Sequence, residues 1–151
     1  GIPLTARGYT TAVRFLTSDK SGVVSDAYWK DLAQTDDTLV FYMSSEILDE
    51  VVSSLTKHHI AADKLLAVIE QATTPLQNIH ITGLYNYQFK GRKFISPSLV
   101  IVGRVVALHE QFGWMTNSNS TAHYFKPLAK LVTTEAGLEN EENVNKHVSR
   151  A

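Results

Sequence analysis

Side chains suited to ligand binding stand where predicted buried strands end or begin. Three such places occur in the chain, at Met43, at Ala72-Thr73 and at Ser98. In open α/β sheets, ligands bind at such points because backbone groups there are unpaired and side chains from separate crossovers converge. If the strands before Met43 and Ala72 are neighbours, these two side chains flank a flat apolar slot. Such a slot suits an adenine ring, which gains dispersion contacts on both faces.

Each of these positions also has a purely structural interpretation. Met43 fits plain core packing at the end of a strand, because methionine fills irregular gaps. The stretch 72–75 fits a strand-to-strand loop shaped by Pro75. The residues alone leave both interpretations open.

The six histidines and the serines form no recognisable metal or catalytic pattern. His58 and His59 are adjacent, so their side chains point away from each other. The others show no ligand spacing with a carboxylate and are interpreted as surface residues: His80, His109, His123 and His147. The chain has no cysteine and no Gly-x-Ser-x-Gly elbow, which leaves thiolate and serine chemistry without support. We expect no metal.

Composition argues against two classes of partner. The formal net charge of -1 comes from 14 basic and 15 acidic residues spread along 151 positions, so no basic footprint for nucleic acid stands out. The apolar runs are far shorter than the roughly 20 residues that cross a bilayer, and no export signal is visible. A cytoplasmic protein without membrane contact is therefore expected.

Alternating apolar runs and amphipathic patterns predict an α/β fold. Five apolar residues in a row, from Leu39 to Met43, indicate a strand buried on both faces. The predicted strands are Val13–Thr17, Thr38–Met43, Leu65–Glu70, Asn78–Gly83 and Leu99–Val102. The predicted helices follow Ser25, follow Met43 with Ser44 and Ser45 as caps, and run from Val105 to Phe112.

Two stretches show no pattern that predicts a helix or a strand. Residues 84–95 are rich in Tyr, Phe and Lys and are broken by Gly91, which predicts no regular element. Residues 116–121 are only Thr, Asn and Ser, as in a linker with nothing to bury. We expect a core domain over 1–114 and a polar linker and tail over 115–151, the tail being either a docking helix or a loosely attached extension.

Four segments, 1–5, 39–43, 70–77 and 98–103, resemble in this order the C-terminal half of the tetrapyrrole methylases, of the uroporphyrinogen III C-methyltransferase type. The resemblance covers about 1–114. It implies a mixed sheet flanked by helices and a homodimer. It also implies an N-terminal domain before Gly1 that holds the glycine-rich loop and the acid/base residues. The chain alone is then expected to carry no catalytic residue and to be inactive.

The resemblance also implies a cofactor, S-adenosylmethionine, contacted by Met43, Ala72, Thr73 and Ser98. Ala72 occupies a position that is often glycine in the family, and its methyl group restricts the backbone. Arg7 matches a family arginine, and its guanidinium suits the carboxylates on the rim of a tetrapyrrole substrate. An exposed arginine with a local structural partner is the alternative. The family usually has histidine where this chain has Ala6.

The expected reaction is the conversion of uroporphyrinogen III to precorrin-2, for sirohaem or cobalamin. Methyl transfer of this kind depends mainly on alignment of the reacting atoms and exclusion of water. Two alternatives remain: another methyltransferase of this fold, acting on a corrin ring or ribosomal RNA, and a non-enzymatic assembly domain that uses the aromatic residues of 84–95 as an interface.

Overall fold

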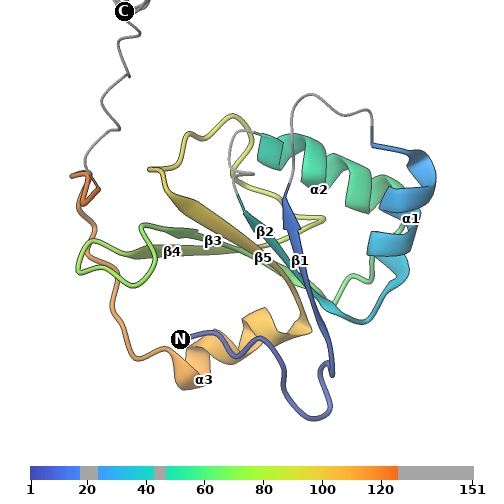
Figure 1. Ribbon diagram of the computed structural model, residues 1–151, viewed down its shortest axis with the longest axis horizontal. Helices are drawn as coiled ribbons and strands as arrows, with labels where there is room; N and C mark the ends of the chain where they lie inside the picture. The colour runs from blue at the N-terminus through green and yellow to red at the C-terminus, as the bar shows by residue number, and fades with distance from the viewer. Residues whose placement is uncertain (18–23, 43–46, 126–151) are drawn as a thin grey trace, which may run out of the picture.

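A single five-stranded mixed sheet forms the centre of the molecule, as predicted (Figure 1). The computed structural model describes residues 1–17, 24–42 and 47–125. The strands lie in the order β1-β2-β5-β3-β4, with β1 and β2 parallel and every other neighbouring pair antiparallel. Their bounds are β1 Val13–Thr17, β2 Thr38–Tyr42, β3 Leu65–Glu70, β4 Asn78–Gly83 and β5 Ser98–Gly103.

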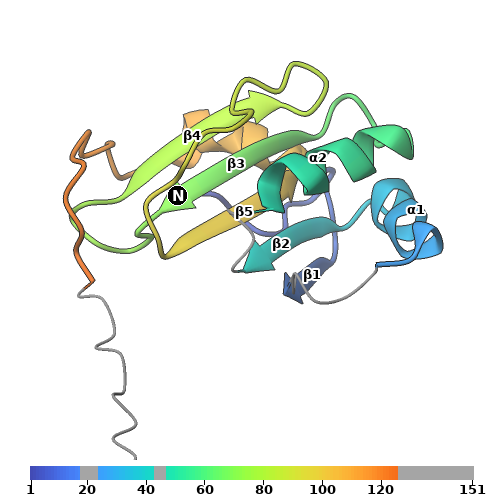
Figure 2. The same ribbon diagram turned by 90° about the horizontal axis from the view of Figure 1, so that it is seen from above.

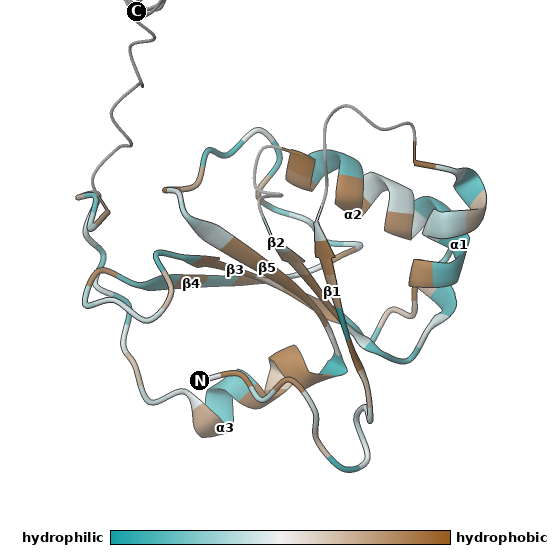
Figure 3. Cartoon of the chain, viewed as in Figure 1, coloured by the Kyte–Doolittle hydropathy of each residue, from teal (hydrophilic) through white to brown (hydrophobic). Residues whose placement is uncertain are grey.

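Two helices cover one face of the sheet, α1 (Asp26–Gln34) and α2 (Leu48–Lys57). Figure 2 shows both on the same side of the strands, and Figure 3 shows apolar residues along these helices and strands. Their buried side chains pack against alternate residues of β2, β3 and β5, including Leu39, Leu66 and Val100. Burial of these side chains accounts for most of the driving force that holds the layers together.

Local sequence explains where these helices form. Ser25 precedes α1, and its Oγ accepts a hydrogen bond from the Tyr28 N–H at 3.2 Å, which satisfies one free donor of the first turn. In α2 one stripe of side chains is buried, comprising Leu48, Val51, Val52 and Leu55. Ile47, which precedes α2, makes no side-chain capping hydrogen bond. The predicted caps Ser44 and Ser45 lie outside the described residues.

The other face is covered by a shorter layer. The predicted helix over 105–112 is instead a 3-10 helix, η2 (Arg104–Leu108), followed by one turn of α-helix, α3 (His109–Phe112). Val106 packs with Val40 and Ile101 of the sheet, and Ile2 and Leu4 of the N-terminal segment lie against this cluster. Among the helices of the described ranges, none has the length and hydropathy needed to cross a membrane.

The polar segment 116–121, expected to be a linker with nothing to bury, forms hydrogen bonds with an edge strand of the sheet. The Asn117 side chain accepts from the Ile79 N–H at 2.7 Å and donates to the Ile79 carbonyl at 3.0 Å. These bonds satisfy backbone groups of β4, which is an edge strand. Composition indicated little burial, and it gave no sign that the amides would pair with an unpaired strand edge.

Candidate functional site

Three chain segments meet at one edge of the sheet. β2 and β3 run in the same direction, so both end at this edge, where β5 begins. β2 and β3 are not neighbours, so the condition stated for a slot between Met43 and Ala72 is not met: β5 lies between the two strands and pairs with both. The register places Tyr42 and Ile69 on either side of Leu99, and Ser98 beside Glu70. Met43 lies outside the described residues, so its meeting with Ala72 stays a prediction.

The loop after β3 has an unusual backbone. Gln71 has φ 49° and Thr73 has φ 67°, both in the left-handed region that favours glycine. The loop is held by hydrogen bonds from Gln71 N to the Pro97 carbonyl at 2.8 Å and from Thr73 N to Gln77 Oε1 at 2.8 Å. Strain of this kind persists only where the surroundings impose it, and it concentrates at ligand-binding loops. Ala72, between the two, is half-buried.

Ser98 has a hydroxyl group that its surroundings leave unsatisfied. Its Oγ is buried and has no hydrogen-bond partner among the described residues. Burial of a hydroxyl without a partner costs about 1–3 kcal/mol, so such groups mark places where a ligand could supply the missing bond. Ser98 begins β5 and the Ala72-Thr73 loop follows β3, so both lie at the same edge of the sheet.

Arg7 lies elsewhere. It is exposed, in a tight turn closed by hydrogen bonds between Ala6 and Thr10, shortly before β1 begins (Figure 1). Because β1 is parallel to β2, this turn lies toward the edge where β2 begins, opposite Ala72 and Ser98. The structure therefore separates Arg7 from the other predicted site residues.

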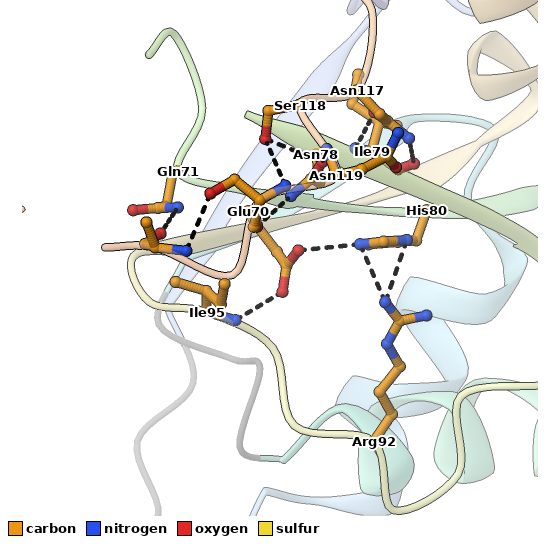
Figure 4. A network of polar contacts seen from close by, with 12 residues as sticks. Glu70, Gln71, Asn78, Ile79, His80, Arg92, Ile95, Asn117, Ser118 and Asn119 are labelled. Carbon is orange, nitrogen blue, oxygen red and sulfur yellow. Dashed lines mark hydrogen bonds and ion pairs between the residues drawn. The ribbon is translucent and has the colours of Figure 1, made fainter. Parts of the chain in front are cut away.

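Glu70, the last residue of β3, forms a polar cluster that sequence reasoning missed (Figure 4). The residue is 5% exposed. Oε2 lies 3.0 Å from His80 Nε2, and Oε1 accepts from the Ile95 N–H at 2.7 Å. His80 is thus a paired, half-buried residue of β4, not a surface histidine as predicted. A glutamate ending an apolar strand was the available signal.

The aromatic stretch 84–95 is folded against this cluster. Asp49 of α2 accepts from the Tyr87 hydroxyl at 2.6 Å and from the Gly91 N–H at 3.0 Å. Burial and this bond to Asp49 raise the pKa of Tyr87. Phe89 and Phe94 lie 5.6 Å apart between ring centres, and both are close to the His80 ring. These partners are distant in sequence, which is why no local pattern predicted this loop.

Two cavities flank the stretch. One of about 450 Å³ is lined by α2 and the stretch itself, and one of about 310 Å³ by Glu70, His80 and the segment 119–121. Arg92 and Lys93 line both. Ala72 and Ser98 are lining residues of neither. No cluster of three or more potential metal ligands occurs within residues 1–17, 24–42 and 47–125.

Solved structures share this fold. The uroporphyrin III C-methyl transferase from Thermus thermophilus matches with a TM-score of 0.59 and 21% identity, over 71% of this chain and 46% of that chain. The same Thermus thermophilus enzyme complexed with S-adenyl homocysteine gives a TM-score of 0.59 and 22% identity, over 71% of this chain and 48% of that chain. At these identities the likeness establishes the fold alone.

Sequence comparison establishes the family. The model of the Tetrapyrrole (Corrin/Porphyrin) Methylases matches residues 1–87, and the chain belongs to this family. A siroheme synthase from Pseudomonas fluorescens is 39% identical over 122 residues, covering 80% of this chain and 26% of that protein. One from Neisseria meningitidis is 33% identical over 138 residues, covering 88% and 29%. The chain thus spans about a quarter of the length of these relatives.

Proposed function

We propose that this chain supplies one half of the cofactor pocket of an S-adenosylmethionine-dependent C-methyltransferase that converts uroporphyrinogen III to precorrin-2. The other half and the acid/base residues belong, in this proposal, to an N-terminal domain of the complete gene product. Support comes from the siroheme synthases it resembles and from the related fold solved with S-adenyl homocysteine. A cytoplasmic homodimer that binds neither nucleic acid nor membrane completes the proposal.

The observation that carries the proposal is the convergence of strained and unsatisfied groups at one sheet edge. The left-handed residues beside Ala72 and the unpaired hydroxyl of Ser98 lie where β3 ends and β5 begins. In this proposal Ala72 and Thr73 approach the adenine, Met43 covers its other face, and Ser98 gives a hydrogen bond. Arg7 is assigned to the substrate, across the subunit or domain boundary.

The test measures methyl transfer by the complete gene product, with variant Ala72→Leu. A larger side chain at this half-buried loop position obstructs the adenine, so we expect the KM for S-adenosylmethionine to rise at least about tenfold, the loss of about 1.4 kcal/mol of binding. Ala61→Leu is the matched control, because Ala61 is also half-buried but stands before β3, at the opposite edge.

Three results would contradict the proposal or a part of it. One is that the wild-type gene product transfers no methyl group to uroporphyrinogen III, followed as the absorbance of the methylated product. Another is that Ala72→Leu and Ala61→Leu have equal KM values for S-adenosylmethionine. Activity of the isolated 151-residue chain would contradict the assignment of the acid/base residues to another domain.

A further inference from the structure

The stretch 84–95 holds one guanidinium group in a fixed place between the two cavities. Arg92 Cζ lies 5.0 Å from the centre of the Phe94 ring and 5.5 Å from that of Phe89. Its Nη2 lies 3.3 Å and 3.4 Å from the two nitrogens of His80 (Figure 4). Contacts between a guanidinium and aromatic faces restrict the side chain without neutralising its charge.

The backbone near Arg92 is also fixed. The Arg92 N–H donates to the Phe89 carbonyl at 2.9 Å, and Gly91 has φ 71°, a conformation that glycine adopts without strain. Gly91 N is in turn bound by Asp49. The side chain therefore starts from a defined turn, so little further ordering is needed when a ligand binds.

The carboxylates that line the cavities do not neutralise Arg92. Both oxygens of Glu70 have partners in His80 and the Ile95 N–H, and both oxygens of Asp49 have partners in Tyr87 and Gly91. Among the residues that the structure describes, neither Arg92 nor Lys93 has a carboxylate within 4.0 Å. Two adjacent cations thus face the cavities with the local acidic groups already satisfied.

We propose that Arg92, assisted by Lys93, binds a carboxylate group of a ligand. A planar guanidinium donates two parallel N–H···O bonds to a carboxylate, while the flexible ammonium of Lys93 adds charge. Asn119, Ser120 and Thr121 line the same 310 Å³ cavity and offer further polar groups. The identity of the ligand rests on the proposed function, which provides two sources: a rim carboxylate of the tetrapyrrole and the amino-acid carboxylate of the cofactor.

The test compares binding of two probes to the complete gene product, uroporphyrin by its fluorescence and S-adenosylhomocysteine by calorimetry. Arg92→Gln is expected to weaken uroporphyrin binding at least about tenfold, as for loss of a charge-assisted pair of hydrogen bonds. The uroporphyrin affinity of Arg92→Lys should lie between those of Arg92→Gln and the wild type, because lysine keeps the charge but lacks the planar pair of N–H donors. Affinity for S-adenosylhomocysteine should not change.

Lys90→Gln is the matched control, because it removes one positive charge from the same stretch at an exposed residue that lines neither cavity. Loss of S-adenosylhomocysteine affinity alone in Arg92→Gln would support the carboxylate site and assign it to the cofactor. Equal effects of Arg92→Gln and Lys90→Gln, or wild-type protein that binds neither probe, would overturn the inference. If Arg92→Gln binds both probes normally while methyl transfer persists, the inference fails and the proposed function stands.

Discussion

Charged side chains gather at both edges of the sheet, and the two edges treat them differently. At the edge where β2 and β3 begin, basic and acidic groups pair with one another. At the edge where they end, the carboxylates are bound by histidine, hydroxyl and backbone groups, and the cations Arg92 and Lys93 face cavities. We call the first, where β2 and β3 begin, the closed edge, because the charges of its arginine networks are paired. We call the second, where β2 and β3 end, the open edge, because Arg92 and Lys93 are left able to bind a ligand.

The closed edge contains two arginine networks. Arg14 bonds to Asp37 at 2.6 Å and also to Asp31. Arg104 bonds to Asp63 at 2.6 Å and to Asp36 at 2.7 Å. These pairs join β1 to α1 and to the loop before β2, and join the start of η2 to the loops before β2 and β3. Arg14 and Arg104 each have two carboxylate partners, so neither of these two guanidinium groups is free to bind a ligand.

The buried Lys64 belongs to the same closed edge. It is 2% exposed, and its Nζ donates to the Thr35 carbonyl. Burial is the main cause that lowers its pKa, and the charge of Arg104 acts in the same direction. Its bond to a backbone carbonyl gives it a structural role in joining the loops before β2 and β3.

The substitution with the largest expected effect removes Glu70, the buried carboxylate of the open edge. Glu70→Ala should lower the free energy of unfolding by about 3 kcal/mol, because it leaves the Ile95 N–H and His80 without their buried partner. Glu70→Gln keeps an acceptor and should cost about half as much. Urea denaturation followed by circular dichroism measures both. A cost for Glu70→Ala below about 1 kcal/mol, typical of an exposed pair, would remove this distinction between the edges.

The second prediction concerns backbone strain at the open edge. Thr73→Gly should raise the free energy of unfolding by about 1 kcal/mol, because a β-branched residue at φ 67° is strained and glycine is not. Thr73 is exposed, so little packing is lost. Ala72→Gly is the matched control, because its φ is not positive, and it should cost about 0.5–1 kcal/mol. Both are measured by urea denaturation, and a loss of stability in Thr73→Gly would contradict strain there.

Local patterns were sufficient to predict the five strands and the helices α1 and α2. The strands β1, β3 and β4 have the predicted bounds, since short apolar or alternating runs between turn residues specify strands directly. Strand order was not predictable in the same way. Insertion of β5 between β2 and β3 depends on pairing between segments about 60 and 30 residues apart, which no local period records.

The candidate site was predictable only in part, for the same reason. Ala72 and Ser98 were identified from strand ends, which follow from the elements. The pairing of Glu70 with His80 and the contacts of Arg92 with Phe89, Phe94 and His80 depend on the fold of 84–95. The partners of that stretch lie on α2, β3 and β4. Aromatic residues without a helical or strand period gave no indication of what they would contact.

The smallest expected effect tests the closed edge through pH. Asp37→Asn should lower the free energy of unfolding at pH 7 by about 1 kcal/mol or less, because the pair with Arg14 is partly exposed. The hydrogen bond from Arg14, followed by that from Thr35, lowers the pKa of Asp37 in the folded state. This stabilisation is therefore present above the unfolded pKa of about 4 and is lost as pH falls through the folded value.

The difference between wild type and Asp37→Asn should consequently shrink as the pH is lowered below about 4. Urea denaturation at a series of pH values from neutral to acidic measures it. Asp36→Asn serves as the control, since Asp36 also pairs with an arginine but its side chain is 79% exposed, so a smaller change in the free energy of unfolding is expected. A difference for Asp37→Asn that stays constant with pH would show that the Arg14 pair does not act through charge. The closed edge would then owe its stability to packing, and the contrast with the open edge would no longer be electrostatic.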